Sequence, residues 1–300
     1  MPRLTTDDVV VAAQLACLLE ASAPKPGNVS PGRDFADARY QDFLASAAAI
    51  GSALAEAGTR PLGTTVRLAI EATARWTRSN TNLGIVLLLA PLARAALTSH
   101  RGGTPPSSDS TLRDEVRRML DLTTVDDARE VYTAIRLASP GGLGRADTQD
   151  VADEPTMTLL EVMKLAAHRD WIAREYATGF ATTFERGAPA LEAARRDGLS
   201  WDDAIVETFL ILVAAEPDTH IARRGGHAFA ARVSQRARAV LDAGGVRSIS
   251  GQQAIVEMDL DLRDADHTAN PGTAADLTAA AIYVVLLSGG WGDGGCDAAA

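Results

Sequence analysis

Helix-forming patterns run through almost all of this 300-residue chain, and they limit its fold more than any other feature. Apolar residues recur at spacings of three and four, the period of a helix with one buried face. Aromatic residues make up only 5% of the chain, which disfavours strands. We therefore predict an all-α fold: a single compact multi-helix domain over residues 1–290, with a flexible tail at 291–300.

The predicted helices often begin with Ser or Thr followed three residues later by an acidic residue, a pairing that caps the first turn. Three such pairs are Thr124 with Asp127, Ser200 with Asp203, and Thr273 with Asp276. The predicted helices span residues 5–22, 39–57, 61–78, 83–98, 110–120, 124–137, 156–184, 188–196, 201–215, 226–243 and 273–288.

One segment, VEMDLDLR at residues 256–263, alternates apolar and charged residues as a half-buried strand would. Ile255, Met258 and Leu262 also lie on one helical stripe. No second alternating segment could pair with a strand here, and a lone strand leaves its backbone groups without partners. We therefore predict a helix for this segment.

Two polar loops interrupt the helical pattern. The loop at 99–110 could separate two helical halves of the domain. The loop at 139–155 is long for a structureless connection, and loops of this length often serve as lids or binding loops.

Charge and cysteine content exclude several classes of protein. A net charge of −10 argues against nucleic-acid binding, which selects basic surfaces. The two cysteines, Cys17 and Cys296, form neither a disulfide framework nor a metal-binding spacing. No apolar run reaches membrane-spanning length, and the acidic residues near the N-terminus disfavour a signal peptide. We expect a cytoplasmic protein, and a homodimer is compatible with these features.

Four Gly/Pro-containing loops, each next to a predicted helix end, carry most of the polar residues that could bind a ligand. They lie at 25–35, 79–84, 217–226 and 269–277. A glycine-rich turn at a helix N-terminus offers free N–H groups that suit phosphate, although helix caps and stops use the same residue types. The chain has no GxxxxGK[ST] phosphate loop and no dinucleotide fingerprint.

Together the four loops predict a polyphosphate site with magnesium. Mg²⁺ usually joins one or two protein carboxylates to substrate phosphates. The predicted metal ligands are Asp34, Asp218 and Asp276. The predicted cofactor-binding residues are Lys25, Gly27, Asn28, Arg33, Asn80, Asn82, Gly84, Arg223, Arg224, Gly225, Gly226, Asn270 and Gly272.

The predicted helix at 156–184 repeats polar residues every seven positions, at Glu161, His168 and Glu175. On this stripe His168 could act as a general base and Glu175 as a magnesium ligand. The same stripe is also typical of a solvated face with charge pairs. His168 and Glu175 join Asp34 and Asp218 as the predicted catalytic residues.

The four loops, in this order, resemble the family of triphosphoribosyl-dephospho-coenzyme A synthases, all-helical enzymes that serve the acyl-carrier proteins of citrate lyase and malonate decarboxylase. The similarity covers about residues 10–288. The segments that carry it are Lys25-Pro26-Gly27, Asn80-Thr81-Asn82-Leu83-Gly84, Asp218-Thr219 with Arg224-Gly225-Gly226, and Pro271-Gly272 with Ala275-Asp276-Leu277.

The resemblance implies a reaction in which the 2′-hydroxyl of dephospho-coenzyme A attacks the ribose C1 of ATP and adenine leaves. Such a reaction requires cations and Mg²⁺ at the triphosphate, a carboxylate near the positive charge on the sugar, and a donor for the adenine. Asp34 and Asp218 are the first choices for the carboxylate roles.

The chain departs from the family pattern at several positions, which leaves the donor and the acceptor open. Leu83 stands where citrate-lyase-type members usually have lysine, His220 where they have asparagine, and Arg33-Asp34-Phe35 where they have His-Asp-Met. One alternative is ribosyl-phosphate transfer from ATP or phosphoribosyl pyrophosphate to another cofactor precursor, such as a pterin or furan C1 carrier. Another is a nucleotide-binding helical protein without catalysis.

Overall fold

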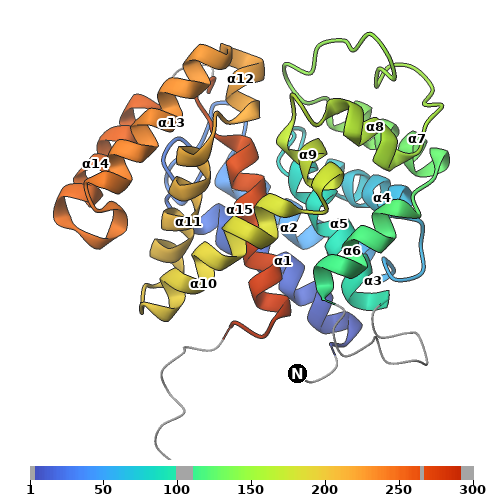
Figure 1. Ribbon diagram of the computed structural model, residues 1–300, viewed down its shortest axis with the longest axis horizontal. Helices are drawn as coiled ribbons and strands as arrows, with labels where there is room; N and C mark the ends of the chain where they lie inside the picture. The colour runs from blue at the N-terminus through green and yellow to red at the C-terminus, as the bar shows by residue number, and fades with distance from the viewer. Residues whose placement is uncertain (1–3, 99–110, 264–266, 292–300) are drawn as a thin grey trace, which may run out of the picture. The chain divides into compact units, whose positions relative to one another are not determined.

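The computed structural model describes residues 4–98, 111–263 and 267–291, and every regular element within these ranges is helical (Figure 1). The one β-type pairing in the described ranges is an isolated bridge between Ser30 and Arg33. The all-α prediction is thus confirmed. Among these helices none is both long and apolar enough to cross a membrane.

The helices form two compact units. Unit 1 contains Met1–Cys17 and Gln41–Ala181, and unit 2 contains Leu18–Tyr40 and Thr182–Ala300. Helix α1 (Thr6–Ser22) passes from unit 1 into unit 2 after Cys17. The division does not fall at the predicted 99–110 loop, because the helices on either side of it, α5 and α6, pack together in unit 1. Residues 99–110, and 292–300 of the predicted tail, lie outside the described residues.

Unit 1 is organised around α5, which packs against α3, α4, α6, α7 and α9. Nearly all of α5 is apolar and buried, as expected for a helix surrounded by others. The helices of this unit are α2 (Tyr40–Ala49), α3 (Gly51–Ala55), α4 (Leu62–Ala74), α5 (Leu83–Thr98), α6 (Leu112–Asp121), α7 (Val125–Ala138), α8 (Leu159–Ala166) and α9 (Trp171–Thr178).

Helix α5 contains a proline in its interior, and a side chain from α9 compensates for it. Pro91 has no N–H, so the carbonyl of Leu87, one turn earlier, loses its helical hydrogen-bond partner. The hydroxyl of Tyr176 on α9 donates to this carbonyl at 2.7 Å. Tyr176 is fully buried, and burial raises the pKa of its hydroxyl far above the ordinary value, so it remains a donor.

The predicted helix at 156–184 is wrong, because the chain breaks between α8 and α9. The Asp170 carboxylate accepts the N–H groups of Ile172 and Ala173 at 2.8 and 3.1 Å and starts a new helix there. Gly179, with φ +64°, then ends α9 after only eight residues. His168 lies in the turn between the two helices, so the seven-residue stripe of polar side chains does not exist.

Unit 2 is organised around α15, whose contacts are with α10, α11, α12 and the π-helix η1. The alternating segment at 256–263 belongs to α14, so the helix prediction there is confirmed. The helices of this unit are η1 (Thr183–Gly187), α10 (Ala188–Arg196), α11 (Trp201–Ala215), α12 (Thr219–Gly225), α13 (His227–Asp242), the 3-10 turn η2 (Gly245–Arg247), α14 (Ile249–Asp261) and α15 (Gly272–Leu287).

Candidate functional site

Three of the four predicted loops lie in unit 2, and the structure brings them together. The loop at 25–35 contacts the end of α14 and the segment before α15, while the residues around Asp218 contact the start of α15. We call this set, residues 25–36, 218–226, 259–263 and 267–274, the three-loop site. It gathers polar groups from parts of the chain that are far apart in sequence.

Asp218 caps two helices at once. Its Oδ1 accepts the N–H groups of His220 and Ile221, at 2.7 and 3.1 Å, in the first turn of α12. Its Oδ2 accepts the N–H of Ala274, at 2.7 Å, in the first turn of α15. Figure 1 shows α12 beside the end of α15 where that helix starts. The carboxylate is only 1% exposed, so in this state it holds two helix N-termini together and does not face solvent.

Thr273 strengthens the same junction. Its hydroxyl accepts the N–H of His220 at 3.1 Å and lies 3.1 Å from the hydroxyl of Thr219. The predicted capping pair of Thr273 with Asp276 is therefore wrong: α15 starts at Gly272 without a side-chain cap of its own, since Asp218 supplies a carboxylate from α12. The predicted pairs at Thr124 and Ser200 do cap their helices.

Asp218 and His220 have pKa values shifted in opposite senses. Burial raises the pKa of Asp218 from 3.8 to about 6, against the backbone N–H donors and Arg223, which favour the charged form. Burial, together with the positive charges of Arg223 and Arg224, lowers the pKa of His220 from 6.5 to about 4. Near neutral pH the carboxylate is thus charged and the imidazole is neutral.

Gly27 occupies a position that only glycine fits. Its φ of +76° is left-handed, and a Cβ there would lie 2.9 Å from the Cβ of Leu262 and 3.3 Å from the Cδ of Pro271. The close approach lets its N–H donate to Oδ1 of Asp259 on α14 at 2.9 Å. The predicted importance of this glycine thus has a steric reason.

The carboxylate of Asp259 holds the loop at 25–35 through several contacts. Besides the Gly27 N–H, it accepts Nε and Nη2 of Arg263, at 2.9 and 2.8 Å, and it forms an ion pair with Arg33. Arg263 Nη2 also donates to the carbonyl of Asn28 at 2.8 Å. The Asp259 carboxylate is nearly buried, whereas the Arg33 side chain is 45% exposed.

The segment at 267–270 presents polar atoms without partners. His267 stacks on Phe35, with ring centroids 3.9 Å apart, and its Nε2 accepts the N–H of Ala36 at 3.1 Å. In the neutral imidazole the ring proton is then on Nδ1. This Nδ1, Oδ1 of Asn270 and Nε2 of His220 are buried without a hydrogen-bond partner in the part of the chain that the structure describes. Buried polar atoms of this kind call for a partner such as a bound ligand, ion or water.

Lys25 is the first residue of the three-loop site, but its side chain is engaged in a buried ion pair. Its side chain is 1% exposed, and Nζ lies 3.0 Å from Oε1 of Glu20 at the end of α1. It also donates to the carbonyl groups of Glu20 and Ala23. Contact between Lys25 and a phosphate would require this buried ion pair to open.

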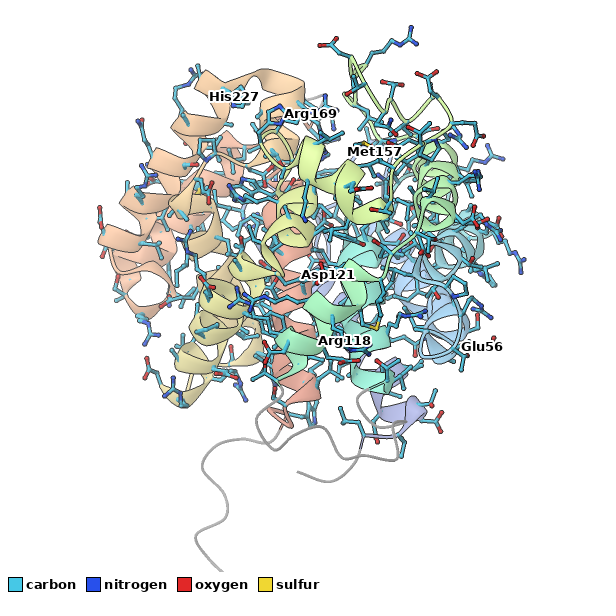
Figure 2. All side chains as sticks on the ribbon, turned by 45° about the vertical axis from the view of Figure 1, so that its right-hand side comes forward. Glu56, Arg118, Asp121, Met157, Arg169 and His227 are labelled. Carbon is cyan, nitrogen blue, oxygen red and sulfur yellow. The ribbon has the colours of Figure 1, made fainter. Side chains whose placement is uncertain are left out.

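Arg223 and Arg224 lie in the last turn of α12 and are close enough to His220 to lower its pKa. Gly225 ends the helix against Phe229, where a Cβ would lie 2.5 Å from the ring, and Gly226, with φ +86°, starts α13. His227 follows as the first residue of α13 and is exposed (Figure 2). The Arg-Arg-Gly-Gly segment thus ends one helix and starts the next, with its two arginines beside the site. Gly272 packs closely against the same helix, since a Cβ there would lie 3.2 Å from the ring of His220 on α12.

The three predicted metal ligands do not gather. Asp34 is exposed, and its Oδ1 accepts the N–H of Tyr40 at 2.8 Å, while Asp218 is committed to helix capping. Asp276 is the fifth residue of α15, beyond its first turn. Within the described residues, no three or more His, Cys, Asp or Glu side chains form a group that could hold a metal ion.

The remaining predicted loop, at 79–84, belongs to unit 1 and makes its own contacts there. Asn80 Oδ1 accepts the N–H of Leu83 at 3.1 Å, which caps the start of α5. Asn82 is buried, and its Nδ2 donates to the hydroxyl of Thr73 on α4 at 3.1 Å. Gly84 is the second residue of α5. These contacts stabilise the loop, and its role in ligand binding stays a prediction.

The two predicted catalytic residues of the 156–184 segment also lie in unit 1, in different environments. Glu175 is fully buried within α9. His168 is exposed in the turn after α8, where its Nδ1 lies 2.9 Å from the carbonyl of Leu165. Their catalytic roles stay predictions as well.

Sequence reasoning missed Asp259, Arg263 and His267, which are central to the three-loop site. Asp259 and Arg263 are four residues apart at the end of a helix, a common spacing for a surface ion pair. Nothing local distinguishes such a pair from a structural one, because the partners at Gly27 and Asn28 are more than 230 residues away.

Comparison with known proteins agrees with these motifs. The family model of ATP:dephospho-CoA triphosphoribosyl transferase matches residues 6–294. Two curated relatives, from Pseudomonas fluorescens and Pseudomonas aeruginosa, are both named "Probable 2-(5''-triphosphoribosyl)-3'-dephosphocoenzyme-A synthase". They are 35% identical over 119 residues and 37% identical over 123 residues. These matches cover 39% and 40% of this chain, and only 40% and 41% of the relatives.

A crystal structure from Archaeoglobus fulgidus, assigned as a triphosphoribosyl-dephospho-CoA synthase, is also similar. It has a TM-score of 0.62 and 29% sequence identity, and the match covers 82% of this chain and 99% of that one. The family match extends over nearly the whole chain, through both units and all four motif loops. The chain therefore belongs to the ATP:dephospho-CoA triphosphoribosyl transferase family.

Proposed function

We propose that this protein transfers the 5-triphosphoribosyl group of ATP to the 2′-hydroxyl of 3′-dephospho-CoA. The observation that carries the proposal is the family match over residues 6–294. In the reaction the bond between ribose C1 and adenine N9 breaks, and a bond from C1 to the acceptor oxygen forms. The hydroxyl proton leaves with adenine, so the products are 2′-(5″-triphosphoribosyl)-3′-dephospho-CoA and free adenine.

The three-loop site contains groups suited to each part of this reaction. Arg33, Arg223 and Arg224 supply positive charge for a triphosphate. His267 Nδ1 and Asn270 Oδ1 are a donor and an acceptor without described partners, a combination that suits a polar leaving group such as adenine. We assign these residues to substrate binding.

Asp218 and Asp34 differ in the roles that their surroundings favour. The three backbone N–H groups on Asp218 favour a positioning role, in which it holds the starts of α12 and α15 beside the arginines. Asp34 is exposed and has carboxylate capacity beyond the Tyr40 N–H. We therefore favour Asp34 as the carboxylate that faces the substrate.

Magnesium fits this site only as a companion of the substrate. Mg²⁺ is commonly held by one or two carboxylates together with substrate phosphates, and Asp34 is the exposed carboxylate that could provide such a ligand. When bound, the ion would neutralise charge on the triphosphate. Magnesium dependence and adenine release are both parts of the proposal.

The test is to incubate the protein with ATP, Mg²⁺ and dephospho-CoA, and to follow adenine by chromatography and the product by mass. We expect equal amounts of adenine and a product heavier by one triphosphoribosyl group. ATP without dephospho-CoA is the control, since adenine released there would come from hydrolysis. Intact ATP with both substrates present, in protein that binds ATP, would refute the proposal.

One observation supports a different acceptor. Leu83, where citrate-lyase-type members usually carry a lysine, is buried at the start of α5, so this position supplies no positive charge. Because this loss leaves both donor and acceptor open, the second candidate is transfer from ATP or phosphoribosyl pyrophosphate to another cofactor precursor, such as a pterin or furan carrier. If adenine from ATP, or pyrophosphate from phosphoribosyl pyrophosphate, is released only when such a precursor replaces dephospho-CoA, this second candidate is correct.

A further inference from the structure

Two of the arginines in the three-loop site contact the same carboxylate, that of Asp259. Asp259 carries one negative charge, and both Arg33 and Arg263 contact it, so among the described residues this contact joins two positive charges to one carboxylate. Arg33 and Arg263 come from segments of the chain that lie 230 residues apart, yet they converge on a single carboxylate. This pair of positive charges could attract an anion.

The two arginines are held very differently. Arg263 donates from Nε and Nη2 to the Asp259 carboxylate, and from Nη2 also to the Asn28 carbonyl. These contacts hold its guanidinium group in place. Arg33 contacts Asp259 through Nη1 alone, and its side chain is 45% exposed. Arg33 has five N–H donors, and within the described residues only Nη1 is engaged with this carboxylate, so its other donors could bind a ligand.

Asp259 is itself fixed in place. Its Oδ1 accepts the N–H of Gly27 at 2.9 Å, and the left-handed φ of Gly27 brings that N–H to the carboxylate. The carboxylate is nearly buried beside the end of α14. Together with Arg263 it forms a rigid base against which the exposed guanidinium of Arg33 rests.

From this arrangement we infer that Asp259 and Arg263 are positioning residues that aim Arg33 at a polyphosphate group of the substrate. Arg33 is the contact residue, and the other two residues act through it. This inference rests on the proposed function for the identity of the ligand, an ATP-type triphosphate. It also explains why Lys25, paired with Glu20, is not needed as the phosphate-binding cation of this loop.

The test measures the binding of inorganic tripolyphosphate by calorimetry, without any catalytic step. We expect Arg33→Gln to weaken binding by roughly tenfold or more, as is usual for a lost hydrogen bond between charged groups. Arg263→Lys should weaken it comparably, because lysine keeps the charge but cannot form the two-pronged contact with Asp259. The matched control is Arg236→Gln. Arg236 lies on α13 and contacts Glu257 and Asp261 of α14, the helix that also carries Asp259. This control should bind as the unmodified protein does.

Two further variants separate positioning from a general effect of charge. Asp259→Asn removes a negative charge, so a purely electrostatic effect would tighten the binding of the anion. If Asp259 instead positions Arg33, the variant should bind the anion more weakly, and this is the result that we expect. The double variant Arg33→Gln, Arg263→Lys should bind no more weakly than Arg33→Gln alone, since Arg263 acts through Arg33.

Several results would overturn the inference: Arg263→Lys binding like the unmodified protein, Asp259→Asn binding more tightly, or losses that multiply in the double variant. Circular dichroism and urea midpoints check that each variant is folded, and Arg33→Gln, at an exposed side chain, keeps the test valid if another variant unfolds.

Adenine release is measured separately. Tripolyphosphate binding that depends on Arg33 without adenine release would refute the proposed function alone, and adenine release with an unchanged KM for ATP in Arg33→Gln would refute this inference alone.

Discussion

Asp218 and His220 are predicted to compensate each other in the pH dependence of stability. His220 titrates at about 4 in the folded protein and near 6.5 when unfolded, so acidification protonates the unfolded chain first and destabilises the fold. Asp218 titrates at about 6 when folded and near 3.8 when unfolded, so acidification protonates the folded protein first and stabilises it. The two effects operate in nearly the same pH window and have opposite signs.

The size of each effect follows from the two shifts. One pKa unit corresponds to about 1.4 kcal/mol, so between about pH 7.5 and about pH 4.5 His220 should lower the free energy of unfolding by about 2.5 kcal/mol. Over the same interval Asp218 should raise it by about 2 kcal/mol. In the unmodified protein the pair therefore contributes almost no net pH dependence. Removing either partner should reveal the effect of the other.

The variants that test this are His220→Asn and Asp218→Asn. Native-state hydrogen exchange of the α12 and α15 amides, corrected for intrinsic exchange, reports the free energy of opening at each pH. Relative to the unmodified protein, His220→Asn should gain about 2.5 kcal/mol and Asp218→Asn should lose about 2 kcal/mol on acidification over this interval. If both variants follow the pH dependence of the unmodified protein, the burial argument for these two residues is refuted.

Two further predictions concern buried polar groups. Tyr176→Phe leaves the Leu87 carbonyl without a donor and should lower the free energy of unfolding in urea by about 1–3 kcal/mol. The loss should be smaller in a Pro91→Ala background, because alanine restores the helical N–H. An equal loss in both backgrounds would contradict this account. Lys25→Met should cost about 3–5 kcal/mol because it leaves the Glu20 carboxylate buried without its cation. The double variant Lys25→Met, Glu20→Leu should recover most of this loss, and a double variant as unstable as the single one would show that the ion pair is not the cause.

Local sequence patterns predicted the helices well where each helix is specified by its own residues. Helices α5, α10 and α11 begin and end at the predicted residues, 83–98, 188–196 and 201–215. The errors arose where a side chain competes with the apolar period. Asp170 starts a new helix inside the predicted 156–184 segment, and Asp218 does so inside a segment that was predicted to be a loop.

The site was less predictable than the fold, because its key contacts are not local. The loops at 25–35, 217–226 and 269–277 were identified as candidates from their residue types, and they do meet in unit 2. The roles of individual residues could not be derived in this way: Lys25 is paired with Glu20, and Asp259 looks like an ordinary helix residue in the sequence. Such assignments depend on contacts between distant segments, which residue patterns do not encode.

The hydrogen bond between the Gly27 N–H and Asp259 has a consequence for the order of folding. It joins residues 232 positions apart. At roughly 5–20 residues per second, a ribosome needs about 10–50 s to synthesise the intervening chain, so the first loop must wait that long for its partner. Contacts of such long range are also slow to form in the completed chain. The three-loop site should therefore be among the last parts of the protein to mature, and a growing chain should acquire its anion site only after α14 has emerged.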